Sequence, residues 1–218
     1  MPTPPALPDG AKPWLHDLGR WVATWLHRPA FRIRFHGRER IPPTGPVVLV
    51  ANHSSLVEPQ VIFGMVDRRA VFLVKEELAR GPAGRWLRWI GQLSIRRGEP
   101  DREPLLAAVR FLRAGGLVGV FPEGTRGGGD VLRAEQGAAW LVRSSGAVVL
   151  PVACRGTLRP QGSGRRFRPR VDVLVGAPFT VSVQRGRTGL TVATEEIRVR
   201  LADLVGELDR LREQDKAA

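Results

Sequence analysis

The sequence predicts an α/β fold, a mostly parallel central sheet flanked by helices, with an N-terminal amphipathic helix. Short, wholly apolar runs such as residues 47–50 are typical of strands that are covered on both faces of a sheet. Segments with helical periodicity alternate with these runs, which favours parallel strands joined by crossover helices. With 218 residues, of which 43% are hydrophobic, the chain suits one domain with a sizeable core.

The first segment predicts a tail followed by a helix. Residues 1–12 are rich in proline, which is typical of a loose tail. Residues 14–27 predict a helix, because apolar side chains recur at helical spacing on one side: Trp14, Leu15, Leu18, Trp21, Val22, Trp25 and Leu26. Three tryptophans in one stripe are typical of a helix at a membrane interface, although a helix docked on the core has the same period. We therefore divide the chain into residues 1–30, a tail and a helix that could associate with a membrane, and residues 31–218, the main domain.

The main domain alternates strands and helices. We expect strands at residues 31–35, 47–51, 70–74, 117–121, 148–153 and 171–175, where short apolar runs are bounded by turn residues. We expect helices at residues 59–66, 83–90, 103–114, 133–143 and about 194–212, where apolar residues recur with helical spacing. Glu195 and Glu196 fall in the first turn of the last helix, which suits its dipole. Residues 155–170, rich in Gly, Pro and Arg, predict a long loop.

The composition points to an anionic partner. The chain carries 34 lysine and arginine residues against 21 aspartate and glutamate residues, a formal net charge of +13. Such a surplus is typical of proteins that meet nucleic acid, an anionic membrane surface or an acidic carrier protein.

Cysteine content and hydropathy exclude several classes of protein. The single cysteine, Cys154, excludes an internal disulfide and a cysteine-rich metal site, and neither a His-x-x-x-His nor a Cys-x-x-Cys motif occurs, so we expect no metal. The first residues lack a charged segment followed by an apolar one, and no apolar run approaches the ~18 residues that span a bilayer. A protein of this kind that acts on lipid would lie on the membrane surface.

A histidine and a carboxylate lie five residues apart in Asn52-His53-Ser54-Ser55-Leu56-Val57-Glu58. His53 directly follows a predicted strand, and ligands of α/β sheets gather at strand ends. Ser54 and Ser55 favour a turn, and Pro59 suits the first turn of a helix, which could bring the Glu58 carboxylate back to the imidazole. A carboxylate on one ring nitrogen fixes the tautomer and raises the basicity of the other. The pair is therefore a candidate general base with its orienting acid.

A second motif, Phe121-Pro122-Glu123-Gly124-Thr125-Arg126, follows another predicted strand. An arginine fork binds phosphate oxygens in a bidentate manner, and a glycine beside it lets a ligand approach the backbone. These residues suit a phosphorylated ligand, so the two motifs together indicate a transferase that removes a proton from a hydroxyl on a phosphate-bearing acceptor.

Taken together, these residues resemble the glycerolipid acyltransferase family, which includes the lysophosphatidic acid acyltransferases. The family has four sequence blocks, and this chain carries candidates for all four in order. His53 and Glu58 form the first block and residues 121–126 the third. The second resembles Lys75-Glu76-Glu77-Leu78 with residues 91–97, and the fourth is Val149-Leu150-Pro151-Val152. The family usually has Asp where this chain has Glu58, so we expect a slightly different loop or an altered pairing geometry.

The resemblance implies an O-acyltransferase of phospholipid biosynthesis, with residues 31–218 as the acyltransferase domain. It implies an acyl thioester donor, acyl-CoA or acyl-ACP, as co-substrate rather than a cofactor, and a lysophospholipid acceptor, commonly 1-acyl-sn-glycerol-3-phosphate. His53 and Glu58 are then the catalytic residues. Arg126 holds the acceptor phosphate with Lys75 or Arg96 as helpers, Glu123 orients Arg126 or the acceptor hydroxyl, and Gly124 and Thr125 complete the binding motif. We expect a peripheral protein on the cytoplasmic, inner face of an anionic membrane, with Arg85-Trp86-Leu87-Arg88-Trp89 as a second contact or as an ordinary helix packed inward.

Other functions remain open at this point. One is acyl transfer to another lipid hydroxyl, such as that of a lyso-aminolipid or a glycolipid. A second is a non-catalytic lipid-binding protein. A third is a nucleic-acid-binding protein, for which Arg165-Arg166-Phe167-Arg168 would supply a basic patch with an aromatic ring. The basic residues are scattered and no recognised nucleic-acid motif occurs, so we expect no nucleic acid.

Overall fold

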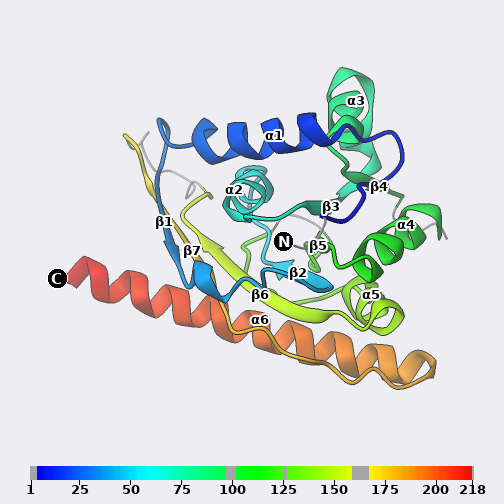
Figure 1. Ribbon diagram of the computed structural model, residues 1–218. Helices are drawn as coiled ribbons and strands as arrows, with labels where there is room; N and C mark the ends of the chain where they lie inside the picture. Colours follow the sequence, from blue (N-terminus) through cyan, green and yellow to red (C-terminus); the bar gives the residue numbers. More distant parts are fainter. Residues whose placement is uncertain (1–3, 97–101, 125–126, 159–166, 218) are drawn as a thin grey trace.

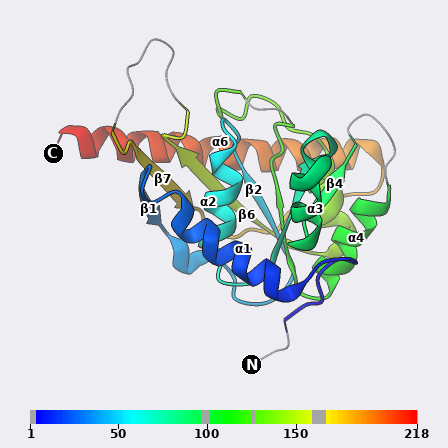
Figure 2. The same cartoon turned by 90° about the horizontal axis from the view of Figure 1, so that it is seen from above.

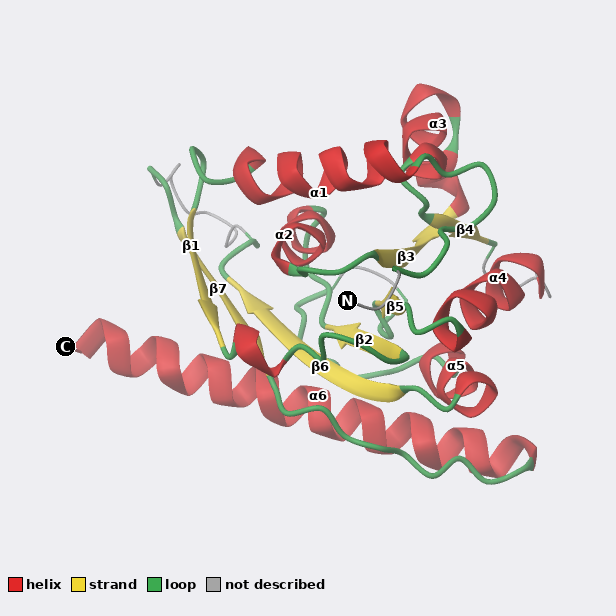
Figure 3. Cartoon of the chain, viewed as in Figure 1, coloured by secondary structure: helices red, strands yellow, loops and turns green. Residues whose placement is uncertain are grey.

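The computed structural model describes residues 4–96, 102–124, 127–158 and 167–217. One sheet runs through the domain in the order β1-β7-β6-β2-β5-β3-β4 (Figure 3). Its strands are β1 (Arg32–His36), β2 (Val47–Ala51), β3 (Ala70–Lys75), β4 (Leu93–Ile95), β5 (Leu117–Val120), β6 (Val148–Arg155) and β7 (Arg170–Val175). All neighbouring strands are parallel except β6 and β7. The predicted mostly parallel α/β fold is confirmed.

Helices cover both faces of the sheet (Figure 1). Apolar side chains of β2 alternate between the faces, so that Val47 and Leu49 belong to one core cluster and Val48 and Val50 to the other. The first cluster is covered by α1 (Pro13–Leu26) and α2 (Val57–Met65), and α3 (Gly81–Trp89) lies at its margin. The second is covered by α4 (Arg102–Arg113), α5 (Gly137–Ser145) and α6 (Gly186–Ala217). Short 3-10 turns follow β1 and β3, at Arg38–Arg40 and Glu76–Ala79.

Most elements lie within about two residues of the predicted bounds, and three differ more. Strand β4 was not expected, because it has only three residues at the edge of the sheet. Helix α6 begins at Gly186 rather than near residue 194, because Leu190 and Ala193 pack against the core and outweigh the low helix propensity of the glycines around them. Helix α5 begins at Gly137 rather than residue 133, since the Glu135 backbone N–H donates to Pro122 O, outside the helix.

Helix α1 packs on the domain mainly through the side opposite its tryptophans. Leu15, His16, Gly19 and Ala23 are buried, and Thr24 Oγ1 donates a hydrogen bond to Gly64 O in α2 at 2.9 Å. The tryptophans point away from the domain: the exposed fractions are 64% for Trp14, 63% for Trp21 and 49% for Trp25. The interpretation in which this stripe docks on the core is therefore wrong for all its members except Leu15, which is buried. Figure 2 shows α1 lying across α2 on the outside of the molecule.

The described part of the chain holds no helix that is both long and apolar enough to cross a membrane.

Candidate active site

The two sequence motifs meet at one edge of the sheet. His53 follows β2 and Glu123 follows β5, and these strands are parallel neighbours with Val50 opposite Val120. The carboxyl ends of parallel neighbours point to the same edge, which is where ligands of α/β sheets bind. The His53 backbone N–H donates to Glu123 Oε1 at 2.7 Å, so the two motifs are in direct contact.

The imidazole of His53 is held on two sides. Its Nδ1 lies 3.1 Å from Glu58 Oε2, so the contact expected from the spacing of the two residues is present. The ring of Phe121 packs against it with centroids 4.6 Å apart and an interplanar angle of 36°. With a carboxylate on Nδ1, the neutral ring carries its proton there and presents Nε2 as the free acceptor. The His53 side chain is only 14% exposed, so this nitrogen lies in a restricted site.

Glu58 lies in the first turn of α2 and is fully buried. Its Oε2 accepts backbone N–H groups from Ser54 at 2.7 Å and Ser55 at 3.0 Å, besides facing His53. Its Oε1 accepts the hydroxyls of Thr157, at 2.6 Å, and Ser54. Burial raises the pKa of the Glu58 carboxyl, but the hydrogen bonds from His53, Ser54, Thr157 and Ser55 outweigh it and leave the pKa below its ordinary value. Glu58 is therefore held as a carboxylate.

Glu123 has the opposite electrostatic balance. Burial raises the pKa of the Glu123 carboxyl, and the hydrogen bonds from the backbone N–H groups of His53 and Val131 only partly offset this effect, so the pKa lies above its ordinary value. Gly124 follows with φ of +72°, a left-handed conformation that favours glycine at this turn. Glu123 thus supports the main chain of His53, a role that the sequence did not suggest.

The remaining predicted binding residues differ in what can be said of them. Thr125 and Arg126 lie outside the described residues. Lys75 ends β3 and Arg96 follows β4, at the same edge of the sheet as His53. Lys75 Nζ pairs with Glu77 Oε1 and Arg96 Nε pairs with Glu76 Oε2, each at 2.9 Å. Strand β5 lies between β2 and β3, so Lys75 is not adjacent to His53 in the sheet.

Three further residues support the site without having been predicted. Asn52 is buried and joins β2 to β6: its Oδ1 accepts the Cys154 N–H at 2.7 Å, and its Nδ2 donates to Gly129 O at 3.2 Å. Arg155 Nη1 donates to Gly128 O at 2.9 Å. Thr157 contacts Glu58, as described above. Asn52 adjoins His53 in the sequence and could have been suspected, whereas the other two depend on β6 being the neighbour of β2.

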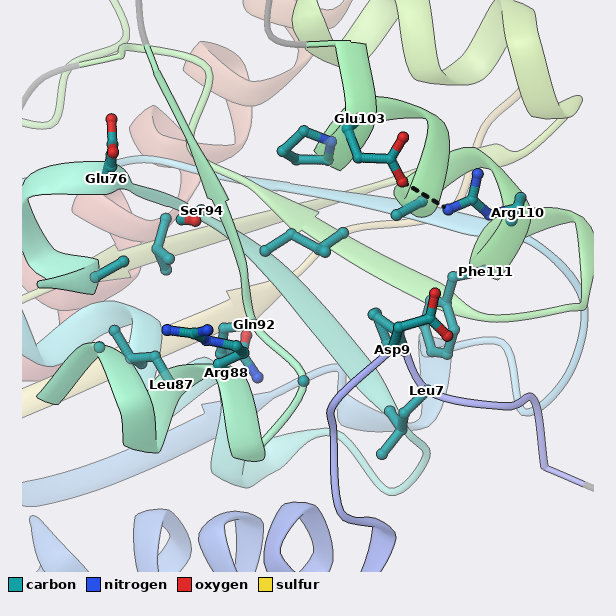
Figure 4. Close-up of a pocket in the computed structure, with 18 of the residues that line it drawn as sticks. Leu7, Asp9, Glu76, Leu87, Arg88, Gln92, Ser94, Glu103, Arg110 and Phe111 are labelled. Carbon is teal, nitrogen blue, oxygen red and sulfur yellow. Dashed lines mark hydrogen bonds and ion pairs between the residues drawn. The ribbon is translucent and has the colours of Figure 1, made fainter. Parts of the chain in front are cut away.

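A pocket of about 670 Å³ lies beside these strand ends, between α3, β4, α4 and the N-terminal segment (Figure 4). Leu7, Leu87, Leu93 and Phe111 give it an apolar interior, and an ion pair of 3.2 Å between Arg110 and Glu103 lies at its wall. Its lining includes Glu76 but none of His53, Glu58 and Glu123. The pocket is therefore a neighbour of the His53 site rather than part of it.

Known proteins resemble the chain in sequence. Residues 32–155 match the family model described as Acyltransferase. A protein of Bacillus subtilis named 1-acyl-sn-glycerol-3-phosphate acyltransferase is 24% identical over 185 residues, which cover 82% of this chain and 91% of that protein. A Borreliella burgdorferi protein of the same name is 27% identical over 143 residues, covering 62% of this chain, and the chain spans about half of that protein, 55% of its length.

A solved structure resembles the chain in fold. The crystal structure of the 1-acyl-sn-glycerophosphate (LPA) acyltransferase PlsC from Thermotoga maritima superposes with a TM-score of 0.66 at 29% identity, covering 90% of this chain and 78% of that one. The matched family model includes both motifs and the strands that carry them. This chain belongs to the acyltransferase family.

Proposed function

We propose that the protein moves a fatty acyl group from an acyl thioester, acyl-CoA or acyl-ACP, to the hydroxyl of a lysophospholipid, 1-acyl-sn-glycerol-3-phosphate. The observation that carries the proposal is the imidazole of His53 with Nδ1 on the buried Glu58 carboxylate, at the sheet edge where Glu123 also lies. The printed names of the relatives support the choice of acceptor.

The reaction needs one base. His53 Nε2 accepts the proton of the acceptor hydroxyl while its oxygen attacks the thioester carbonyl carbon. The C–S bond of the tetrahedral intermediate then breaks, and the thiol, with a pKa near ~8.5, leaves as the thiolate and takes up the proton from His53. Glu58 stays charged throughout and stabilises the imidazolium formed in between. No covalent acyl-enzyme is required, and no cofactor takes part beyond the donor itself.

We assign binding of the acceptor phosphate to the basic residues at the same edge of the sheet. Arg126 is the first candidate, because it follows Glu123, which contacts His53. Gly124 and Thr125 stand between Glu123 and Arg126 in the sequence, and Lys75 and Arg96 lie at the ends of the neighbouring strands β3 and β4. Arg126→Ala should raise the KM for phosphorylated acceptors more than it lowers kcat, and an unchanged KM would argue against a phosphate clamp.

The position we propose for the protein is the surface of an anionic membrane, on its cytoplasmic face, and the outward tryptophans of α1 support contact with a membrane surface. Their side chains remain 49–64% exposed against the described part of the chain. Arg28 stacks on Trp25 at 4.2 Å and Lys12 lies 5.0 Å from the ring of Trp89, so cations accompany the rings. Trp86 and Trp89 of α3 are themselves partly exposed, at 38% and 37%.

A thiol-release assay tests the proposal. Acyl-CoA and acyl-ACP are offered as donors with 1-acylglycerol-3-phosphate, a lyso-aminolipid and a lyso-glycolipid as acceptors. We expect release that depends on the phosphorylated acceptor, and a loss of at least ~100-fold in kcat for His53→Ala, the usual scale for a general base. His36→Ala, on the edge strand β1, is the matched control and should retain activity.

Each alternative function predicts a different result, in this assay or in a binding measurement beside it. Thiol release with only the lyso-aminolipid or the glycolipid would mean that this lipid, and not 1-acylglycerol-3-phosphate, is the acceptor. Vesicle binding without thiol release would indicate a lipid-binding protein, and a salt-sensitive mobility shift of nucleic acid without release would indicate a nucleic-acid-binding protein. Full activity in His53→Ala would overturn the mechanism.

A further inference from the structure

We propose that Thr157 is a positioning residue of the reaction: its hydroxyl fixes Glu58 Oε1 and thereby keeps Glu58 Oε2 on His53. This inference rests on the proposed function, because it assigns a role to a residue that touches the base only through Glu58. Thr157 Oγ1 lies 2.6 Å from Glu58 Oε1, while Glu58 Oε2 lies 3.1 Å from His53 Nδ1.

The two oxygens of Glu58 have different partners. Oε2 receives the His53 ring and two backbone N–H groups from the turn that leads into α2. Oε1 receives only hydroxyls, those of Ser54 and Thr157, among the described contacts. Rotation of the carboxylate about its last side-chain bond would move both oxygens away from their partners, so the hydroxyl contacts on Oε1 resist this rotation and keep Oε2 against the imidazole. A hydrogen bond to a charged group is stronger than one between neutral groups, which makes this contact effective.

Thr157 differs from Ser54 in where it comes from. Ser54 belongs to the turn that already carries His53 and Glu58, whereas Thr157 is 99 residues from Glu58 and follows β6. Its contact therefore fixes the first turn of α2 relative to the sheet. It adds a constraint that the turn cannot supply from within.

The residues just before Thr157 fix the position of its hydroxyl beside Glu58. Gly156 has φ of +95°, and a Cβ there would lie 2.1 Å from Arg170 O, so this sharp turn tolerates only glycine. Just before it, Arg155 pairs with Asp209 of α6 at 2.9 Å. These two features direct the Thr157 hydroxyl toward Glu58 rather than leaving it on a free loop.

The length of Glu58 makes the role specific. Its side chain spans from the first turn of α2 to both His53 and Thr157. An aspartate would be shorter by about one carbon–carbon bond, ~1.5 Å, and could not keep both contacts at hydrogen-bonding distance without movement of the backbone. The hydroxyl of Thr157 should therefore matter when residue 58 is Glu and lose its effect when it is Asp.

The first experiment compares Thr157→Val, which keeps the shape but removes the hydroxyl, with Thr157→Ser, which keeps the hydroxyl. We expect Thr157→Val to lower kcat about tenfold with both KM values changed less than about twofold, and Thr157→Ser to retain at least about half of kcat. Thr194→Val is the matched control, because the Thr194 hydroxyl bonds only Leu190 O within α6. An unchanged kcat in Thr157→Val, or equal losses in the Val and Ser variants, would overturn the proposal.

The second experiment places Thr157→Val in the Glu58→Asp background. We expect the added loss in kcat to be less than about twofold, since the shorter carboxylate no longer depends on Thr157. The same tenfold loss in both backgrounds would mean that Thr157 acts independently of Glu58, against the proposal. If wild type releases no thiol, or His53→Ala is fully active, the proposed function fails and this inference with it. If those two behave as expected and Thr157→Val matches wild type, only the inference fails.

Discussion

Glu123 supports His53 through the main chain: Oε1 accepts the His53 N–H at 2.7 Å. A second contact joins the same segments: the Gly127 backbone N–H donates to His53 O at 3.1 Å. Both polar groups of the His53 peptide unit are thus satisfied by the segment that carries the second motif. The positions of His53 and of the segment that carries Glu123 and Gly127 are therefore coupled, and a change in either should disturb the other.

Glu123→Ala should lower kcat about 10- to 100-fold, because the partly buried His53 N–H loses its acceptor and the imidazole is no longer fixed relative to Glu58. Glu123→Gln keeps an acceptor oxygen at the same place and should retain most of the activity. Steady-state kinetics of the two variants separate these roles. If the Gln variant is as poor as the Ala variant, the charge of Glu123 acts directly on the substrate or on Arg126.

The contribution of Glu123 to the stability of the fold should fall as the pH rises. Its pKa in the folded protein lies above the ordinary 4.5, so the stability that it contributes is present below 4.5 and is lost as pH rises through the folded pKa. Glu123→Gln escapes this loss. We therefore expect the free energy of unfolding of Glu123→Gln, relative to wild type, to be more favourable near about pH 7 than near about pH 4. Denaturant titrations at the two pH values measure the difference, and an equal difference at both would contradict the raised pKa.

Glu58 should show the opposite dependence. Its pKa in the folded protein lies below 4.5, so its stabilising contribution is present above 4.5 and is lost as the pH falls through the folded pKa. Glu58→Gln should cost about 1–3 kcal/mol near neutral pH, since a buried hydrogen-bonded carboxylate is replaced by an amide that cannot accept on both sides. That cost should shrink below about pH 4. A constant cost across this range would mean that Glu58 is not held as a carboxylate.

The sequence predicted those features that depend on local pattern. Strand β2 has the predicted bounds, because three valines and one leucine in a row, between Pro46 and Asn52, are typical of a short strand covered on both faces. The contact between His53 and Glu58 followed from a strand end, a serine turn and a helix start within a few residues. The longer carboxylate, expected to alter the loop or the pairing, reaches both the imidazole and Thr157.

Contacts that depend on strand order could not be predicted. Thr157 meets Glu58 only because β6 lies beside β2, and local periodicity does not specify the order of strands. For the same reason the antiparallel pairing of β7 with β6, within a mostly parallel sheet, carried no signal in the sequence. The face of α1 that packs on the domain was ambiguous, because an amphipathic stripe can face either the core or a membrane. The buried side proved to be that of His16 and Ala23, with Leu15 as the one buried member of the stripe.

The exposed stripe of α1 should determine binding to anionic vesicles. The double variant Trp14→Ser with Trp21→Ser should weaken sedimentation with vesicles that contain an anionic phospholipid, with little change in the melting temperature, because both indoles are mostly exposed. A matched pair refines the test: Val22→Ser on α1 should weaken binding, whereas Val192→Ser on α6, which covers the other face of the sheet, should not. Equal binding by all variants would remove α1 as the contact.

The close packing of α1 on α2 depends on Gly64. A Cβ at this position would lie 2.6 Å from Thr24 N and 2.8 Å from Ala23 C, which are backbone atoms that cannot turn aside. Gly64→Ala should therefore push α1 outward, break the bond from Thr24 Oγ1 to Gly64 O and destabilise the fold by about 1–3 kcal/mol.

Gly206→Ala on α6 is the control for this substitution. The new methyl group would meet only Arg210 Nη1, at 3.7 Å, and the change should stabilise the fold by up to about 1 kcal/mol through helix propensity. Chemical denaturation should thus show opposite signs for the same substitution in two helices. A Gly64→Ala variant as stable as wild type would mean that α1 shifts freely on α2, and the outward presentation of its tryptophans would then not depend on this contact.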